Sequence, residues 1–307
     1  MADTQSAIIP VIRSLYENRN DFFALALAIL LLVFGVWLLT FFRSTLVTKR
    51  LAAEDAGTSK QSFAAPSGQP FFNPPRPEDA PESIRAEVML GYKIMTETKK
   101  YAGEYVNNDL SCSSCHFDGG RSLNTISLVG VGATYPRFRN RQDYTVDLAM
   151  RVQDCFQRSM NGVAPALDSQ VMQSLLVYMQ WISKDIPIYA KLPWALPSDL
   201  GNPHKPDAAN GDKVYADVCA RCHGDNGQGT PIAPPLWGDG SYNAGAGMHR
   251  VSTFSVFAWR FMPKNAPSLT QEQALDVAAF VNGKPRPKFV STGPDKIKRV
   301  IPLPEGK

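Results

Sequence analysis

Two stretches of the sequence decide its fold, and both have the pattern Cys-x-x-Cys-His: Cys112-Ser113-Ser114-Cys115-His116 and Cys219-Ala220-Arg221-Cys222-His223. This pattern is typical of c-type haem attachment, in which the two thiols bind the haem covalently and the adjacent histidine ligates the iron. A zinc site takes four ligands, and His204 and His249 are the only histidines outside the motifs. We therefore expect two covalently bound haems c.

Helical periodicity surrounds each motif. In the first half, apolar spacing predicts helices from Glu82 to about Lys99 and from about Ser169 to Ser183. In the second half, it predicts a helix from about Asn210 to Cys219 and another from a capping box at Thr270 to about Gly283. Each half thus has a helix, a haem motif, a long loop and a closing helix. We expect an all-α fold of two cytochrome c class I-like domains, preceded by one N-terminal transmembrane helix.

The predicted membrane helix lies in the run Phe22 to Phe42, which holds 21 uncharged residues. As a helix it would extend about 31 Å, the thickness of a bilayer core. A cleaved secretory signal is the alternative, although its apolar region is usually shorter. Because c-type haem attachment takes place outside the cytoplasm, we expect a single-pass protein of the cytoplasmic (inner) membrane, with its haem domains in the periplasm or outside.

These patterns divide the chain into seven predicted segments. They are a cytoplasmic N-terminal segment 1–20, a transmembrane anchor 21–43, a Pro-rich spacer 44–80, a first cytochrome c domain 81–186, a linker 187–207, a second cytochrome c domain 208–284 and a basic tail 285–307. The stretch Lys284 to Lys307 holds seven basic residues and two acidic ones, so it can contact lipid headgroups or an acidic partner, or remain solvated. Nothing resembles a nucleic-acid-binding module, and we expect no nucleic acid partner.

The iron of each haem needs a second axial ligand. For the second haem we predict Met262, which precedes Pro263 and a capped helix, with Met248 and His249 as alternatives. Met262 follows His223 by 39 residues, and Cys155 follows His116 by the same 39 residues. Cys155 is therefore the predicted ligand of the first haem.

Two further features favour Cys155 as a thiolate ligand. It is the only cysteine outside the haem motifs, and the nearby Arg151 and Arg158 favour the ionised thiol. A thiolate donates electron density to iron, whereas a thioether raises the haem potential. This difference predicts chemistry at the first haem and electron exit through the second.

The stretch Asp154-Cys155-Phe156-Gln157-Arg158-Ser159-Met160-Asn161-Gly162 resembles the distal-ligand motif of the dihaem thiosulfate dehydrogenases, which can also act as tetrathionate reductases. Four other stretches are similar to that family: 114–120, 234–238, 243–248 and 276–281. The resemblance extends from about Pro75 to Phe289. It implies His/Cys ligation of the first haem and His/Met ligation of the second.

The resemblance also implies an activity, the joining of two thiosulfate ions into tetrathionate with release of two electrons. The active-site positions that it implies are Arg141, Arg151, Cys155 and Ser159. Guanidinium groups and a hydroxyl can hold such small dianions, and a thiolate can attack sulfur. Electrons would pass to a periplasmic cytochrome or a terminal oxidase.

A non-catalytic alternative remains open. A dihaem electron-transfer cytochrome that links a respiratory complex to a terminal oxidase would have the same fold and the same haems. The predicted anchor and the basic tail favour this alternative, whereas the surroundings of Cys155 favour the enzyme.

Overall fold

The computed structural model describes residues 30, 35, 70, 72–123, 125–140 and 142–290. The predicted segment 1–20, all of the anchor 21–43 except residues 30 and 35, the spacer residues 44–69 and 71, the tail beyond residue 290, and Arg141 therefore lie outside the described residues. Within the described ranges, no helix combines the length and apolar character that a membrane crossing needs. The anchor remains a prediction.

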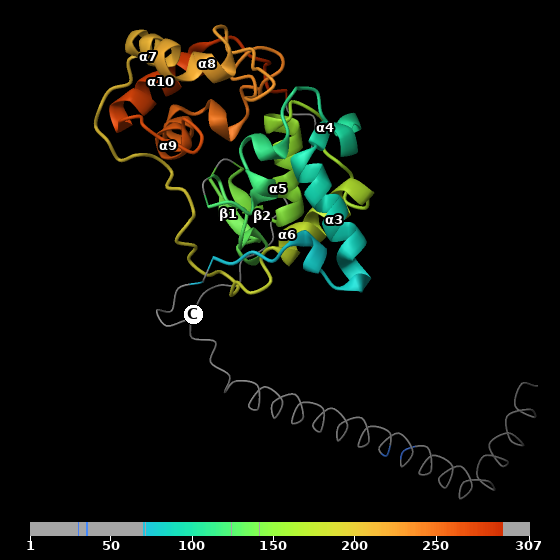
Figure 1. Ribbon diagram of the computed structural model, residues 1–307. Helices are drawn as coiled ribbons and strands as arrows, with labels where there is room; N and C mark the ends of the chain where they lie inside the picture. The colour runs from blue at the N-terminus through green and yellow to red at the C-terminus, as the bar shows by residue number, and fades with distance from the viewer. Residues whose placement is uncertain are drawn as a thin grey trace, which may run out of the picture. The chain divides into compact units, whose positions relative to one another are not determined.

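The first half is built on two packed helices, α3 (Glu82–Thr96) and α6 (Gln170–Trp181), which Figure 1 shows side by side. Both start and end close to their predicted bounds, and the Ser169 hydroxyl caps α6 by accepting from the Met172 N–H at 3.2 Å. Gly91 lies at the crossing, where any Cβ would collide with the carbonyl oxygen of Ser174. A residue without a side chain therefore permits the close approach of the two helices.

Shorter elements complete this half. They are α4 (Thr98–Tyr101), an antiparallel pair of strands β1 (Arg137–Arg139) and β2 (Tyr144–Val146), α5 (Leu148–Asp154) and a π-helical turn, Cys155–Ser159. The Asp147 carboxylate caps α5 by accepting from the Met150 N–H at 2.7 Å.

The second half repeats the plan with α7 (Ala208–Val214), a π-helical turn Tyr215–Cys219, α8 (Ala220–His223), α9 (Val251–Phe261) and α10 (Gln271–Gly283). Helix α10 packs on α7 and on α9. Gly211 of α7 permits a close approach of α7 and α10, as Gly91 does for α3 and α6, because a Cβ there would collide with the carbonyl oxygen of Asp276. The predicted capping box of Thr270 and Gln273 is confirmed at the start of α10.

The structure corrects the expectation of a long loop between each haem motif and its distal ligand. Helix α9 occupies the end of the second loop, and the β1–β2 pair and α5 occupy the first. Helix α9 begins without a side-chain cap at Arg250, and its residues are mainly β-branched, serine or aromatic, which have only moderate helix propensity, so no start signal marked it in the sequence. Helix α5 has only seven residues, too few for a periodic signal. The fold is mostly helical, as predicted, with one small two-stranded sheet in the described part of the chain.

The two halves belong to one compact unit and contact each other directly. The Asp109 N–H donates to the Gly240 carbonyl at 3.0 Å. The ring of Phe117, just after the first haem motif, packs edge-on against Phe257 of α9 with 6.3 Å between ring centroids. The first haem motif therefore faces the second half.

Candidate functional site

Both motif histidines are held in the same way. His116 Nδ1 lies 2.7 Å from the Ile126 carbonyl oxygen, and His223 Nδ1 lies 2.8 Å from that of Pro234. A carbonyl can only accept, so each Nδ1 carries the proton and each Nε2 keeps a lone pair for a metal. Burial lowers the pKa of His116 to about 4 and also lowers the pKa of His223. Both imidazoles are therefore neutral, as iron ligation requires.

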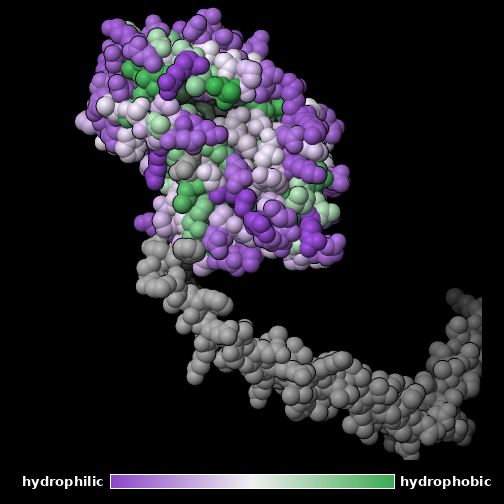
Figure 2. All heavy atoms as spheres, in the orientation of Figure 1, coloured by the Kyte–Doolittle hydropathy of each residue, from purple (hydrophilic) through white to green (hydrophobic). Residues whose placement is uncertain are grey.

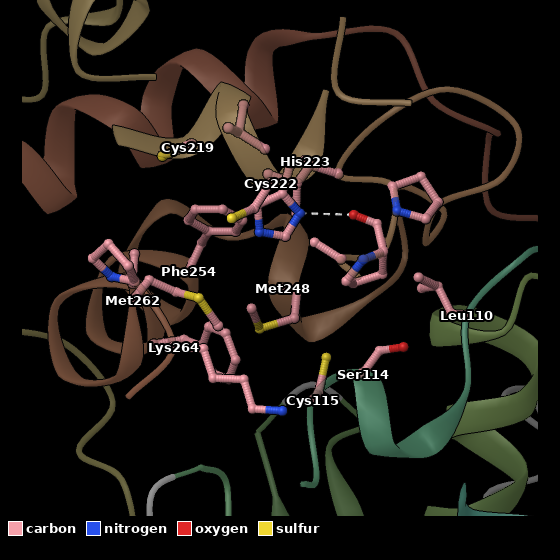
Figure 3. A pocket seen from close by; sticks show the side chains of 18 of the residues that line it. Leu110, Ser114, Cys115, Cys219, Cys222, His223, Met248, Phe254, Met262 and Lys264 are labelled. Carbon is pink, nitrogen blue, oxygen red and sulfur yellow. Dashed lines mark hydrogen bonds between the residues drawn. The ribbon is translucent and has the colours of Figure 1, made fainter. Parts of the chain in front are cut away.

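A cavity of about 380 Å³ lies beside His223. Its lining is mainly apolar and includes Cys219 and Cys222, so the anchoring thiols, the iron ligand and the walls of a haem site come together (Figure 3). Figure 2 shows hydrophobic residues around a hollow on a largely hydrophilic face. These residues fit a covalently bound haem.

Two thioethers face this cavity. Met262 is the first residue after α9, and Met248 lies in a short turn, Gly247–His249, where the Asn282 amide donates to its carbonyl at 3.0 Å. Figure 3 shows both sulfur atoms across the cavity from His223. The geometry therefore holds both candidates in place, and Met262 as the second ligand stays a prediction.

Residues of the first half form part of the wall of this second cavity. Leu110, Ser114, Cys115 and Phe117 line it, and the first three are visible in Figure 3. Since Cys115 is a haem attachment cysteine of the first motif, a haem held there lies next to the second cavity. The arrangement suits electron exchange between two neighbouring haems.

The predicted thiolate ligand of the first haem begins a π-helical turn. Cys155 directly follows α5, as Met262 directly follows α9, so the equal spacing in the sequence corresponds to equal places in the fold. Arg151, one turn earlier, donates from Nη1 to the Cys155 sulfur at 2.8 Å. The thiolate charge raises the pKa of Arg151 above its ordinary value, so the guanidinium stays charged beside it. Single π-helical turns often occur at functional sites.

A second cation, which the sequence analysis missed, lies at this site. Arg139 donates from Nη1 to the Tyr135 hydroxyl at 3.2 Å. Burial lowers the pKa of Arg139, and the positive charges of Arg151 and Arg137 lower it further. Within the described ranges, neither group pairs with a carboxylate. The sequence signal was the alternation Arg137-Phe138-Arg139, which forms strand β1.

Comparison with known proteins gives two family matches and several relatives. Residues 99–188 match the SoxA/TsdA cytochrome c domain, and residues 206–281 match the cbb3-type cytochrome c oxidase subunit III family. The thiosulfate dehydrogenase of Stutzerimonas stutzeri is 40% identical over 78% of this chain and 81% of its own length. That of Allochromatium vinosum is 38% identical over 67% of this chain and 81% of its own. This chain belongs to the thiosulfate dehydrogenase family.

A solved structure agrees with this family assignment. The thiosulfate dehydrogenase TsdBA from Marichromatium purpuratum is 32% identical, with a TM-score of 0.65 over 72% of this chain. The present chain spans half the length of that protein. The two cytochrome c domains and these relatives establish two covalently bound haems c as the cofactors.

The structure brings together some of the residues that the thiosulfate dehydrogenase family implies for the active site. Arg151 and Cys155 are in contact, and Ser159 ends the same π-helical turn. In the described part of the chain, the Ser159 hydroxyl makes no hydrogen bond, so it is available to a ligand. Arg141 lies outside the described residues, and its role stays a prediction.

Proposed function

We propose that this protein joins two thiosulfate ions into tetrathionate at the first haem site and passes the electrons through the second haem to an acceptor. One observation carries the proposal: Arg151 donates to the Cys155 sulfur at 2.8 Å. The charge of Arg151 also lowers the pKa of a second guanidinium, that of Arg139. Positive charge without a carboxylate partner attracts small anions, and planar guanidinium groups bind sulfonate-like oxygens in pairs.

The residues suit a reaction in which sulfur is held covalently. The Cys155 thiolate bonds to the outer sulfur of one thiosulfate, and this step releases two electrons. The outer sulfur of a second thiosulfate then attacks that bound sulfur, which forms tetrathionate and frees the thiolate. The haems, when bound, supply the one-electron acceptors. Each step can run backwards, so the proposal includes tetrathionate reduction.

The roles of the protein groups follow from their positions. Arg151 stabilises the thiolate in its reactive form, and Arg139 offsets the charge of the approaching dianions. The Ser159 hydroxyl supplies a hydrogen bond to a substrate oxygen. Ligation of the iron atoms by His116 with Cys155, and by His223 with Met262, is part of the proposal, with Met248 as the alternative second ligand.

The cellular setting is also proposed. The uncharged run Phe22 to Phe42 supports a single-pass anchor in the cytoplasmic membrane, with the haem domains in the periplasm or outside. The acceptor would be a cytochrome or a terminal oxidase on that side of the membrane. The basic residues of the tail 285–307 support contact with lipid headgroups or with an acidic partner.

The test uses the full-length, haem-loaded protein with thiosulfate and a one-electron acceptor. We expect tetrathionate to form, and Cys155→Ala to abolish its formation while both haems stay attached through Cys112, Cys115, Cys219 and Cys222. Low-temperature electron spin resonance should show a thiolate-ligated low-spin haem in the unchanged protein and lose that signal in the variant. The proposal fails if the intact protein neither forms nor reduces tetrathionate. Rapid electron exchange without either reaction would favour a non-catalytic electron carrier.

A further inference from the structure

The helix that carries Cys155 ends in carbonyl groups that it cannot satisfy by itself. Helix α5 continues into the turn Cys155–Ser159, which closes with bonds from the Met160 N–H to the Cys155 carbonyl at 3.0 Å and from the Gly162 N–H to the Phe156 carbonyl at 2.9 Å. The next four carbonyls point out of the helix end, as at any helix C-terminus. They belong to Gln157, Arg158, Ser159 and Met160.

Each of these four carbonyls accepts a hydrogen bond from outside the helix. The Asn243 side chain donates from Nδ2 to Gln157 at 2.8 Å, and its backbone N–H donates to Arg158 at 3.2 Å. The Asn108 side chain donates from Nδ2 to Ser159 at 2.8 Å. The Asn107 N–H donates to Met160 at 3.1 Å. Two of the four donors therefore come from a single residue of the other haem domain.

The two asparagine side chains are themselves fixed. Asn243 is 2% exposed; its Oδ1 accepts from the Gly245 N–H at 3.0 Å, and its Nδ2 also donates to Asn161 Oδ1 at 3.1 Å. Asn108 is 3% exposed, and its Nδ2 also donates to the Ser241 carbonyl at 3.1 Å. Buried amides that use both donors and acceptor have little freedom to move. They therefore fix the helix end of the first haem domain relative to the second haem domain.

We propose that Asn243, in the second haem domain, is a positioning residue for Cys155: it caps the helix end that presents this thiolate to the first haem. The proposal rests on the proposed function, because it assumes that Cys155 is the distal ligand. It means that the first site is complete only when the two haem domains are docked. Asn108 secures the same helix end from the side of the first domain.

The test compares Asn243→Ala and the isosteric Asn243→Asp with the unchanged full-length, haem-loaded protein. Both variants remove the donor to Gln157 and leave a buried carbonyl unpaired. We expect the thiolate-ligated signal of the first haem to weaken or split, and tetrathionate formation to fall ~10-fold, because an unsatisfied buried carbonyl favours rearrangement of the segment that holds it. The absorption and redox properties of the second haem should not change.

Asn210→Ala is the matched control. It also removes an amide bond in the second domain, from Asn210 Nδ2 to Asp276 Oδ2 at 2.6 Å, but Asn210 lies in α7, which packs on α10 and on the turn Tyr215–Cys219. The first-haem signal should stay unchanged in this variant, whatever happens at the second haem.

Two results would overturn the proposal. One is an unchanged first-haem signal and rate in Asn243→Ala and Asn243→Asp; the other is a change that affects both haems equally. If the Asn243 variants do not retain haem, Asn108→Ala must give the loss at the first haem alone, and failure to do so also overturns it. A missing thiolate signal in the unchanged protein would instead reject the proposed function.

Discussion

Replacing Arg151 by methionine is the sharpest test of the first site. Methionine keeps much of the apolar length of the side chain and removes the charge and the donor that lie 2.8 Å from the Cys155 sulfur. A hydrogen bond to a charged group contributes about 1.5–3 kcal/mol. At about 1.36 kcal/mol for each factor of ten, its loss corresponds to a ~10- to ~150-fold fall in kcat if the bond acts in the transition state.

The assay measures tetrathionate formation at several thiosulfate concentrations, beside the electron spin resonance signal of the first haem. Arg151→Met should lower kcat and alter that signal, because Arg151 contacts the thiolate itself. Arg139→Met should raise KM with a smaller change in kcat, because Arg139 bonds to Tyr135 and adds charge to the site without contacting the sulfur. Arg85→Met is the control, since Arg85 pairs with an acid on the surface of the same half.

Arg151→Lys separates charge from geometry. A lysine keeps the positive charge but lacks the planar fork of donors, so an intermediate kcat is expected. The reasoning is refuted if Arg151→Met retains the kcat and the first-haem signal of the unchanged protein. An equal loss in the Arg85 control would also refute it, because the effect would then not belong to the thiolate contact.

Three further outcomes follow from the structure. Gly91→Ala should lower the free energy of unfolding by about 1–3 kcal/mol, because the new Cβ collides with the backbone of α6. Gly103→Ala is the control, since a Cβ there meets no atom within 4 Å, and thermal unfolding measures both variants. Burial alone would raise the pKa of Asp276, but three donors outweigh it and hold that pKa below its ordinary value of 3.8. The ionised Asp276 carboxylate therefore stabilises the fold fully above pH 3.8 and loses this effect at lower pH. Asp276→Asn should have a lower free energy of unfolding than the unchanged protein at neutral pH, and the gap between the two should shrink when unfolding is measured below pH 3.8. Met262→Ala should lower the reduction potential of the second haem, whereas Met248→Ala should not; the reverse result would assign Met248 as the ligand.

The parts of the fold that local chemistry determines could be predicted from the sequence. The haem motifs fix the attachment sites, and a capping box marks the start of α10, because both depend on neighbours a few residues away. The equal spacing also predicted equivalent places for Cys155 and Met262, each directly after a helix. Helix α9 was missed because no capping residue marks its start and its β-branched and aromatic residues have only moderate helix propensity.

What the sequence could not indicate depends on contacts between distant residues. Arg139 joins the first site through the pairing of β1 with β2, which brings a short strand back toward α5. Asn243 caps a helix end more than eighty positions away in the chain, and no local pattern marks an asparagine for that role. Polar residues buried between domains have the least local signal, because their partners are backbone carbonyls of any residue type.

Under the proposed function, the two haem domains differ in chemistry through the ligand at one equivalent position. After α9, Met262 faces a mainly apolar cavity, whose lining also includes Arg221 and Lys264, and a thioether ligand there favours a high potential. After α5, Cys155 lies against Arg151, and a thiolate ligand there would give the first haem a lower potential. Because Cys115 of the first motif lines the second cavity, electrons released at the first site would have a short route to the second haem. Under this proposal the same fold supplies a reaction centre and an exit, and the ligand at residue 155 with its contact to Arg151 makes the difference.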